Sequence, residues 1–282
     1  LRAALRRGRA TVFHPTKAGP FFLLLPINTQ PRTVSVNISA LPDGGMPGPG
    51  APAGDEDLKA AASIISKGSR VAIKAGGGSR RFAAELTAFA EAASAPVILS
   101  PGSTGVLPDG HPLNMHVGGS KGSISGNFAM AEAETLIVIG SRAVCQSDCS
   151  GIGYPRVREV ININADLDDV THYNHTIALQ GDIGAILRRL TPLVRSATAP
   201  ARSRWLDDCR RQKTAWVEFK SRQFAAAPLL DAVWGMPVLT QPVAIKTVAD
   251  FCKANECLKL FDAGDVQANG FQIVEDDTTA DT

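Results

Sequence analysis

The sequence has 282 residues, of which 44% are hydrophobic and 20% charged, so it can bury a sizeable core in one large domain or in one domain with pieces of others. Its formal net charge of +2, from 29 basic and 27 acidic residues, gives no reason to expect nucleic acid or an anionic membrane as a partner. The five cysteines show no repeating spacing, which disfavours a disulfide scaffold and favours a reducing, cytoplasmic compartment.

The N-terminal part of the chain contains two predicted elements and a linker. LRAALRR (1–7) has the character of the last turns of a helix, although the arginine-rich start would also suit a transit peptide. GPFFLLLPIN (19–28) predicts a buried strand, and its apolar run is too short to cross a bilayer. Residues 41–57 are rich in Pro and Gly, which predicts a linker. Both ends of the chain look interrupted.

From residue 57 onward, predicted helices and strands alternate. The strands are continuous runs of Val, Ile and Leu, typical of strands that are covered by helices on both faces. This alternation predicts an α/β fold with a doubly wound parallel sheet. Asp57 is expected to cap the first helix. The predicted strands are 70–75, 96–101, 135–142, 159–166 and 177–179, and the predicted helices are 57–68, 81–94, 125–134 and 181–194.

Residues 195–240 are predicted to be a second connecting region that contains a basic, tryptophan-bearing helix at 203–223. After it, QPVAIKTVADFCKANECLKLFDAGD predicts a helix followed by a strand, CLKLFDAG (257–264). These elements suggest that a new structural unit begins near residue 240.

A glycine turn in RVAIKAGGGSR (70–80) follows a predicted strand and precedes a predicted helix. Backbone amides and a helix dipole at such a place can hold a phosphate. The dinucleotide fingerprint G-x-G-x-x-G is incomplete, because Arg81 takes the place of the third glycine. The turn is therefore either a phosphate cradle or a plain exit from the strand.

Two further patterns have both a chemical and a structural interpretation. GGSKG (118–122) matches G-x-S-x-G, and Ser120, Asp166 and His172 follow the order of a hydrolase triad, but NMHV is a poor strand for a nucleophile elbow and such short matches arise by chance. A zinc site or ordinary loop residues would explain Cys145, Cys149, His172 and His175. His111 and His116 are expected in a loop, facing a cleft or solvent.

Small and polar residues follow several predicted strands. Ligands of open α/β sheets bind beyond the carboxyl ends of the strands, so these residues are candidates for binding, with turn and capping roles as the alternative. They are Gly76, Gly77, Gly140, Arg142, Asp166 and Asp182.

Six segments taken in order resemble the thiamine-diphosphate-dependent enzymes of the acetolactate synthase and pyruvate oxidase type. They are GPFFLLLPINTQ, AIKAGGGSR, HPLNMHVGGSKG, TLIVIGSR, VININAD and ALQGD, with LFDAGDVQANGFQ resembling the start of the diphosphate-binding domain. The resemblance implies the end of a pyrimidine-binding domain (1–30), a linker (31–56), a Rossmann-like central domain (57–193), a linker (194–239) and the start of a diphosphate-binding domain (240–282).

The resemblance also implies a chemistry and a set of binding residues. Such enzymes use thiamine diphosphate and Mg²⁺ to make or break C–C bonds of a 2-keto acid or diketone, as homodimers or tetramers. Gly264, Asp265 and Gln267 match the segment that approaches the diphosphate, and the strand-end residues match positions that bind FAD in some relatives. The family's catalytic glutamate segment and its G-D-G motif do not occur in this sequence, so the chain by itself is expected to be inactive.

Two alternatives from other classes stay open. The central domain shares its broad fold with NAD-dependent deacylases, although paired C-x-x-C motifs are missing from the sequence. A non-catalytic binding module derived from the central domain would also have this sequence pattern.

Overall fold

The structure is a computed structural model that describes residues 2–14, 18–35, 41, 53–143, 153–170, 173, 175–194 and 200–282. The chain forms two compact units, Leu1–Ala51 and Pro52–Thr282. No helix in the described ranges combines the length and the apolar character that crossing a membrane requires.

The described residues of the first unit contain one helix, and the strand predicted at 19–28 is not formed. Helix α1 spans Arg2–Val12, as the sequence predicts. Residues 18–26 have no regular structure, and Phe22, Leu24 and Ile27 are 85–89% exposed. A strand requires a hydrogen-bonded neighbour, and the described residues of this unit contain none, which is why this apolar run stays extended and open.

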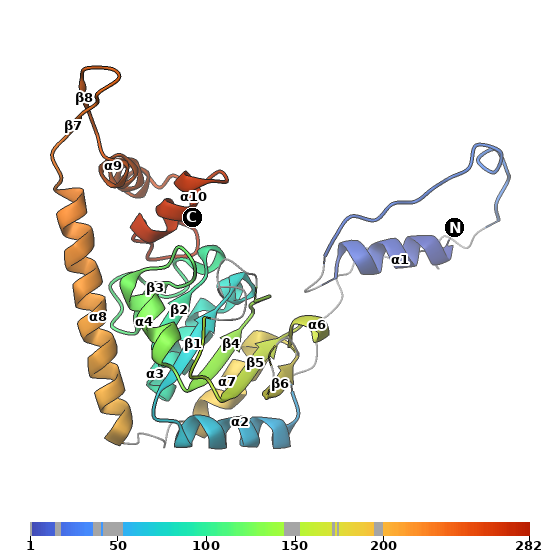
Figure 1. Ribbon diagram of the computed structural model, residues 1–282. Coiled ribbons are helices and arrows are strands. Elements are labelled where there is room, and N and C mark those ends of the chain that lie inside the picture. The colour runs from blue at the N-terminus through green and yellow to red at the C-terminus, as the bar shows by residue number, and fades with distance from the viewer. Residues whose placement is uncertain are drawn as a thin grey trace. The chain divides into compact units, whose positions relative to one another are not determined.

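The second unit is built on a sheet of six parallel strands, shown in Figure 1, which confirms the predicted doubly wound α/β fold. Its spatial order is β3-β2-β1-β4-β5-β6, so the chain reverses its direction of winding between β1 and β4. The strands are β1 (Val71–Ala75), β2 (Val97–Leu99), β3 (Asn114–Val117), β4 (Thr135–Ile139), β5 (Glu159–Asn164) and β6 (Thr176–Gln180).

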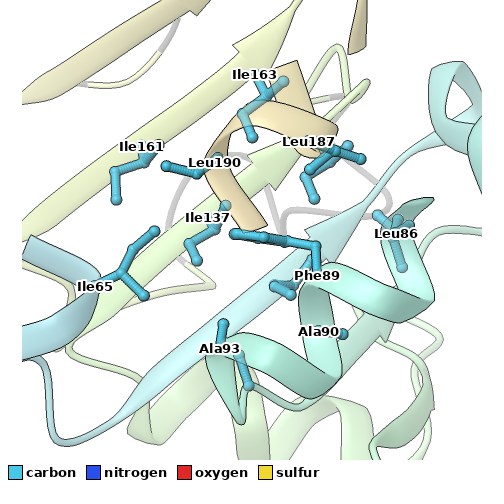
Figure 2. Packing of buried hydrophobic residues seen from close by; sticks show 14 of the residues in the cluster. Ile65, Leu86, Phe89, Ala90, Ala93, Ile137, Ile161, Ile163, Leu187 and Leu190 are labelled. Atoms are coloured by element: carbon cyan, nitrogen blue, oxygen red, sulfur yellow. The ribbon is translucent and has the colours of Figure 1, made fainter. Parts of the chain in front are cut away.

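Helices cover both faces of this sheet, and the central strands β1 and β4 are therefore buried along their whole length. On one face pack α2 (Asp55–Lys67), α3 (Ala83–Ala93) and α7 (Ile183–Val194). Figure 2 shows their side chains converging on Ile137, Ile161 and Ile163 of β4 and β5. On the other face, α4 (Ile124–Glu132) and α8 (Pro200–Phe224) pack over Ala72, Ile98 and Met115.

Helix α8 begins within the predicted connecting region, yet its first half packs against the sheet. The Trp205 ring stacks on Phe128 of α4 with 5.8 Å between centroids, and its Nε1 donates to the Val71 carbonyl at 2.9 Å. The buried Arg202 guanidinium donates to the carbonyls of Ile65, Gly68 and Ala93, at the ends of α2 and α3. The predicted domain boundaries themselves stay a prediction.

Several local expectations differ from the structure. Helix α2 begins at Asp55 with Gly54 as its N-cap, so Asp57 lies inside the first turn and is not the cap. NMHV forms strand β3, since pairing with β2 and burial outweigh its weak propensity. The strand predicted at 257–264 is wrong. These residues lack regular structure and leave Leu258 and Leu260 exposed, with no neighbouring strand in the described part.

The C-terminal region is otherwise helical. A short antiparallel pair, β7 (Leu229–Leu230) and β8 (Pro237–Val238), precedes α9 (Gln241–Ala254) and α10 (Asp265–Ile273). Shorter elements elsewhere in the unit are the 3₁₀ helices η2 (Gly77–Phe82) and η3 (Pro101–Ser103) and the single turn α6 (Leu167–Val170).

Candidate functional site

The exit turns of β1 and β4 touch each other at the carboxyl edge of the sheet. The Gly76 amide donates to the Ile139 carbonyl at 2.9 Å, and the Gly78 amide donates to the Gly140 carbonyl at 3.0 Å. A Cβ at Gly76 would lie 2.3 Å from the Gly140 carbonyl oxygen, and Gly140 itself has φ +60. Glycine occupies positions 76 and 140 because the two backbones approach too closely there for side chains.

These contacts bear directly on the phosphate cradle expected at residues 76–78. The amides of Gly76 and Gly78 donate to carbonyls of β4 and its exit turn, and the Ser79 amide donates to the Gly76 carbonyl at 3.0 Å. The turn continues as the 3₁₀ helix η2 before α3 begins at Ala83. A phosphate needs free donors. In this conformation the Gly76 and Gly78 amides hold the two strand exits together and the Ser79 amide closes the turn, so none of the three is offered to an anion.

The exits of β5 and β6 are held in the same way. The Asn164 side-chain amide donates to the Ser141 carbonyl at 3.1 Å, and the Gly181 amide donates to the Asn164 carbonyl at 3.1 Å. The Asp166 carboxylate accepts from the Asp168 amide at 3.0 Å, and the Asp182 carboxylate accepts from the Ala185 amide at 2.7 Å. Both carboxylates thus fill turn and capping roles at the starts of α6 and α7.

The structure brings most of the predicted strand-end residues to one edge, but it places the predicted diphosphate segment elsewhere. Gly76, Gly77 and Gly140 lie in adjoining turns, with the exposed Arg142 just beyond. Gly264, Asp265 and Gln267 lie at the start of α10. There the Gly264 carbonyl accepts from the Ala268 amide at 3.0 Å, and the Asn269 side-chain Nδ2 donates to Gln241 Oε1 of α9 at 2.7 Å.

The other sequence candidates do not assemble into a site within the described residues. Cys145, Cys149 and His172 lie outside them. Ser120 is exposed in the loop between β3 and α4, and six residues (118–123) separate that strand from the helix, so there is no sharp nucleophile elbow. The loop ends at Ser123, whose hydroxyl accepts from the Gly126 amide at 2.9 Å as the N-cap of α4.

Sequence reasoning missed a buried charged cluster on the α8 side of the sheet. His116 is buried within β3, not in a loop, and has φ +62. Its Nε2 lies 3.2 Å from the Asp109 carboxylate and its Nδ1 lies 3.2 Å from the Ser125 hydroxyl. Two lysines of α8, Lys213 and Lys220, face this pair. The residues are far apart in sequence, and the sequence offered only His116, which was expected in a loop, as a sign of this place.

Burial and neighbouring charges shift three pKa values in this cluster. Burial lowers the pKa of His116 below 6.5; the Asp109 carboxylate opposes that shift and the two lysines reinforce it. Burial alone would raise the pKa of Asp109, but the hydrogen bond and charge of His116, with the lysines, hold it below 3.8. Burial also lowers the pKa of Lys213 to about 8.

Within the described residues, the side chains that usually bind metal ions do not gather into a group that could hold a divalent cation. A Mg²⁺ ion requires several oxygen ligands that converge on it. Across the described ranges, no three His, Cys, Asp or Glu side chains are grouped closely enough to hold a metal ion. At the start of α10, the Asp265 carboxylate adds a negative charge, and no described atom lies within 4 Å of a Cβ built at Gly264 to wall a diphosphate.

Comparison with known proteins identifies relatives for the sheet-bearing part of the chain. Residues 58–190 match the family described as "Thiamine pyrophosphate enzyme, central domain". A probable 2-ketoarginine decarboxylase of Pseudomonas aeruginosa is 30% identical over 198 residues, which cover 68% of this chain and 34% of that protein.

Two other relatives match over a shorter stretch. The acetolactate synthase isozyme 1 large subunit of Escherichia coli is 28% identical over 152 residues, covering 54% of this chain and 26% of that protein. The 3D-(3,5/4)-trihydroxycyclohexane-1,2-dione hydrolase of Listeria monocytogenes is 27% identical over 167 residues, 56% of this chain and 26% of that protein. The alignments with these three curated relatives thus span 26–34% of the relatives' length.

Proposed function

Since this chain belongs to the family of thiamine pyrophosphate enzymes, we propose that residues 57–193 serve as the structural centre of such an enzyme. In the complete protein, thiamine diphosphate (another name for thiamine pyrophosphate) with Mg²⁺ would supply the carbanion that makes or breaks a C–C bond beside a carbonyl. This chain's own contribution is then a rigid scaffold and a contact between subunits, rather than catalytic groups.

The observation that supports the scaffold role is the backbone hydrogen bonding between the exits of β1 and β4, where the strand order of the sheet reverses. Ligands of doubly wound sheets bind where the strand order reverses, here between β1 and β4. At that point the Gly76 and Gly78 amides are hydrogen-bonded to Ile139 and Gly140. Because these amides at the carboxyl edge of the sheet already donate to backbone carbonyls, they stabilise the two strand exits and are not free to bind a polyphosphate.

The substrate class is proposed from the names of the relatives. They include an acetolactate synthase, a probable 2-ketoarginine decarboxylase and a trihydroxycyclohexanedione hydrolase. Each of the three names refers to a carbonyl compound, which supports a 2-keto acid or a diketone as the substrate of the complete enzyme. The same proposal includes a homodimeric or tetrameric assembly, a cytoplasmic location, and a lyase or transferase reaction for the complete enzyme.

Isothermal titration calorimetry of this chain with thiamine diphosphate and Mg²⁺ tests the scaffold role. We expect no saturable heat, because the described residues do not converge on a diphosphate or a metal ion. Binding with micromolar affinity would contradict the proposal and assign cofactor contacts to this chain.

Titrations with FAD and with NAD address the other ligands considered for this fold. The strand-end residues Gly76, Gly77, Gly140, Arg142, Asp166 and Asp182 stay candidates for a flavin, and FAD binding would require the first turn to release its amides. NAD binding would instead favour the deacylase-like alternative. If neither ligand binds, a scaffold or a non-catalytic binding module is supported.

A further inference from the structure

A partly buried charge cluster, with His116 and Lys220 at its buried centre, joins three segments of the second unit that are far apart in sequence. Asp109 lies in the loop before β3, and His116 lies within β3. Lys213 and Lys220 project from the second half of α8, and Glu275 follows α10. The cluster thus sits where α8 and the C-terminal segment meet the β2–β3 loop.

The contacts of the cluster hold these three segments together. Lys220 Nζ lies 2.9 Å from Glu275 Oε1 and 4.0 Å from Asp109 Oδ1. Lys213 Nζ donates to the carbonyls of Asp109 and His111, at 2.8 and 2.6 Å. The Asp109 amide donates to the Asp276 carbonyl at 3.0 Å. Every contact therefore links the loop to α8, the loop to the C-terminal segment, or α8 to that segment.

The charges of this cluster balance only when His116 is neutral. Asp109 and Glu275 supply two negative charges, and Lys213 and Lys220 supply two positive charges. Lys246 also reaches Glu275, at 3.5 Å, but it has its own partner in Asp250. A proton on His116 adds a third cation, and an uncompensated charge in a buried site is costly.

From this geometry we propose that the Asp109–His116–Lys220–Glu275 cluster is a proton-sensitive latch. With His116 neutral it holds the second half of α8 and residues 274–277 against the β2–β3 loop, and a proton on His116 releases them. The first half of α8 stays in place, because Arg202 and Trp205 anchor it to the sheet independently. The latch fixes the position of the segment that follows Gly264, Asp265 and Gln267.

The direction of the pH effect follows from the groups that face the imidazole. Within the described residues these are Asp109 from the loop, Ser125 from α4, and Lys213 and Lys220 from α8. The pKa of His116 is lower in the latched state than its ordinary value of 6.5, so the released state binds the proton more tightly. The latch is therefore intact between about pH 6.5 and about pH 8, where Lys213 is still protonated, and weakens as pH falls below 6.5. Asp109, with its pKa below 3.8, stays ionised throughout that window.

Hydrogen exchange read by mass spectrometry on the full chain tests the latch. Protection factors, which already correct for the intrinsic exchange rates, are measured for residues 213–224 and 274–282. They are divided by those of β1 and β4 at each pH, so that changes in global stability cancel. We expect this ratio to fall by up to about tenfold per pH unit below about pH 6.5. The ratio for residues 202–209 should not fall. A ratio for 213–224 that is unchanged between about pH 7.5 and 5.5 would overturn the proposal.

Three variants assign the effect to His116. Asn tolerates the left-handed backbone of residue 116, so His116→Asn should abolish the pH dependence of the ratio. Lys220→Met removes one cation, so that a protonated His116 balances the charges. The fall of the protection ratio with decreasing pH should therefore be weaker in this variant. His111→Asn is the control. It changes an imidazole that lies 3.2 Å from Glu91, away from His116, and keeps the backbone carbonyl that accepts from Lys213, so the fall of the ratio with decreasing pH should be unchanged. An unchanged fall in His116→Asn would contradict the latch.

Discussion

At the scale of single residues, glycine is found where two backbones come into contact, and a charged side chain is found where separate segments are joined. Gly76 and Gly140 bring the exits of β1 and β4 into direct hydrogen-bonding contact. Arg202 does the opposite, since its long buried side chain satisfies carbonyls at the ends of two helices. Both residue types solve the same physical problem, which is to leave no buried backbone group without a partner.

Gly76→Ala tests the close approach of the two strand exits. The new Cβ would lie 2.3 Å from the Gly140 carbonyl oxygen and 2.5 Å from Ser141 Cα, and neither backbone atom can move away cheaply. We expect the free energy of unfolding, measured in urea, to drop by about 1–3 kcal/mol. Gly77→Ala is the matched control, because its Cβ would lie 3.4 Å from the Gly102 carbonyl oxygen. Equal losses in both variants would argue against the close-approach explanation.

Arg202→Met tests the anchoring of α8. Methionine fills much of the same space but leaves the carbonyls of Ile65, Gly68 and Ala93 without the guanidinium donors. An unsatisfied buried polar group costs about 1–3 kcal/mol, so the chemical denaturation midpoint should fall by an amount equivalent to about 3 kcal/mol. Arg204→Met, at an exposed position of the same helix, should change stability by less than about 0.5 kcal/mol.

At the scale of elements, pairing decides which apolar runs become strands. NMHV forms β3 although only two of its four residues are apolar, because β2 lies beside it. FFLLL and LKLF stay irregular although they are more apolar, because the described residues offer them no neighbouring strand. The C-terminal region consequently leaves large apolar side chains open to solvent, and a cavity of about 300 Å³ lies between α9, residues 259–261 and α10.

This exposed apolar region predicts dye binding and self-association. Val233 and Leu260 are each 87% exposed, and Trp234 is 73% exposed. Native monomers seldom expose so many large apolar side chains together, so the chain should enhance the fluorescence of 8-anilinonaphthalene-1-sulfonate and associate at micromolar concentration in light scattering. Val248→Lys, at the wall of the cavity, should reduce the dye signal. Lys59→Ala on the exposed face of α2 is the control and should leave the signal unchanged.

At the scale of the whole molecule, the sheet-bearing unit contains a segment that matches the thiamine pyrophosphate enzyme central domain, and packed helices extend it. Residues 58–190 supply the family match and all six parallel strands. Helix α8 adds a further layer beyond that match and carries the lysines of the proposed latch. Polar contacts therefore join the central sheet, α8 and the C-terminal segment of the second unit.

Much of this architecture could be predicted from local patterns. The runs VAIKA, TLIVI and EVININ predicted buried parallel strands, and the residues after them do gather at one edge, because parallel strands end together. The site was harder to predict. Whether the Gly76 and Gly78 amides face a ligand or another carbonyl depends on the position of β4, more than fifty residues away in the chain.

The sequence alone determined the alternation of helix and strand, the doubly wound sheet and the family, since each depends on short patterns and their order. Only the tertiary structure decided that the glycine turn is bonded to its neighbour, that α8 belongs to the core, and that Asp109, His116, Lys213, Lys220 and Glu275 form one cluster. Hydrogen bonds and buried charges join residues that are distant along the chain, and periodicity carries no information about such distant partners.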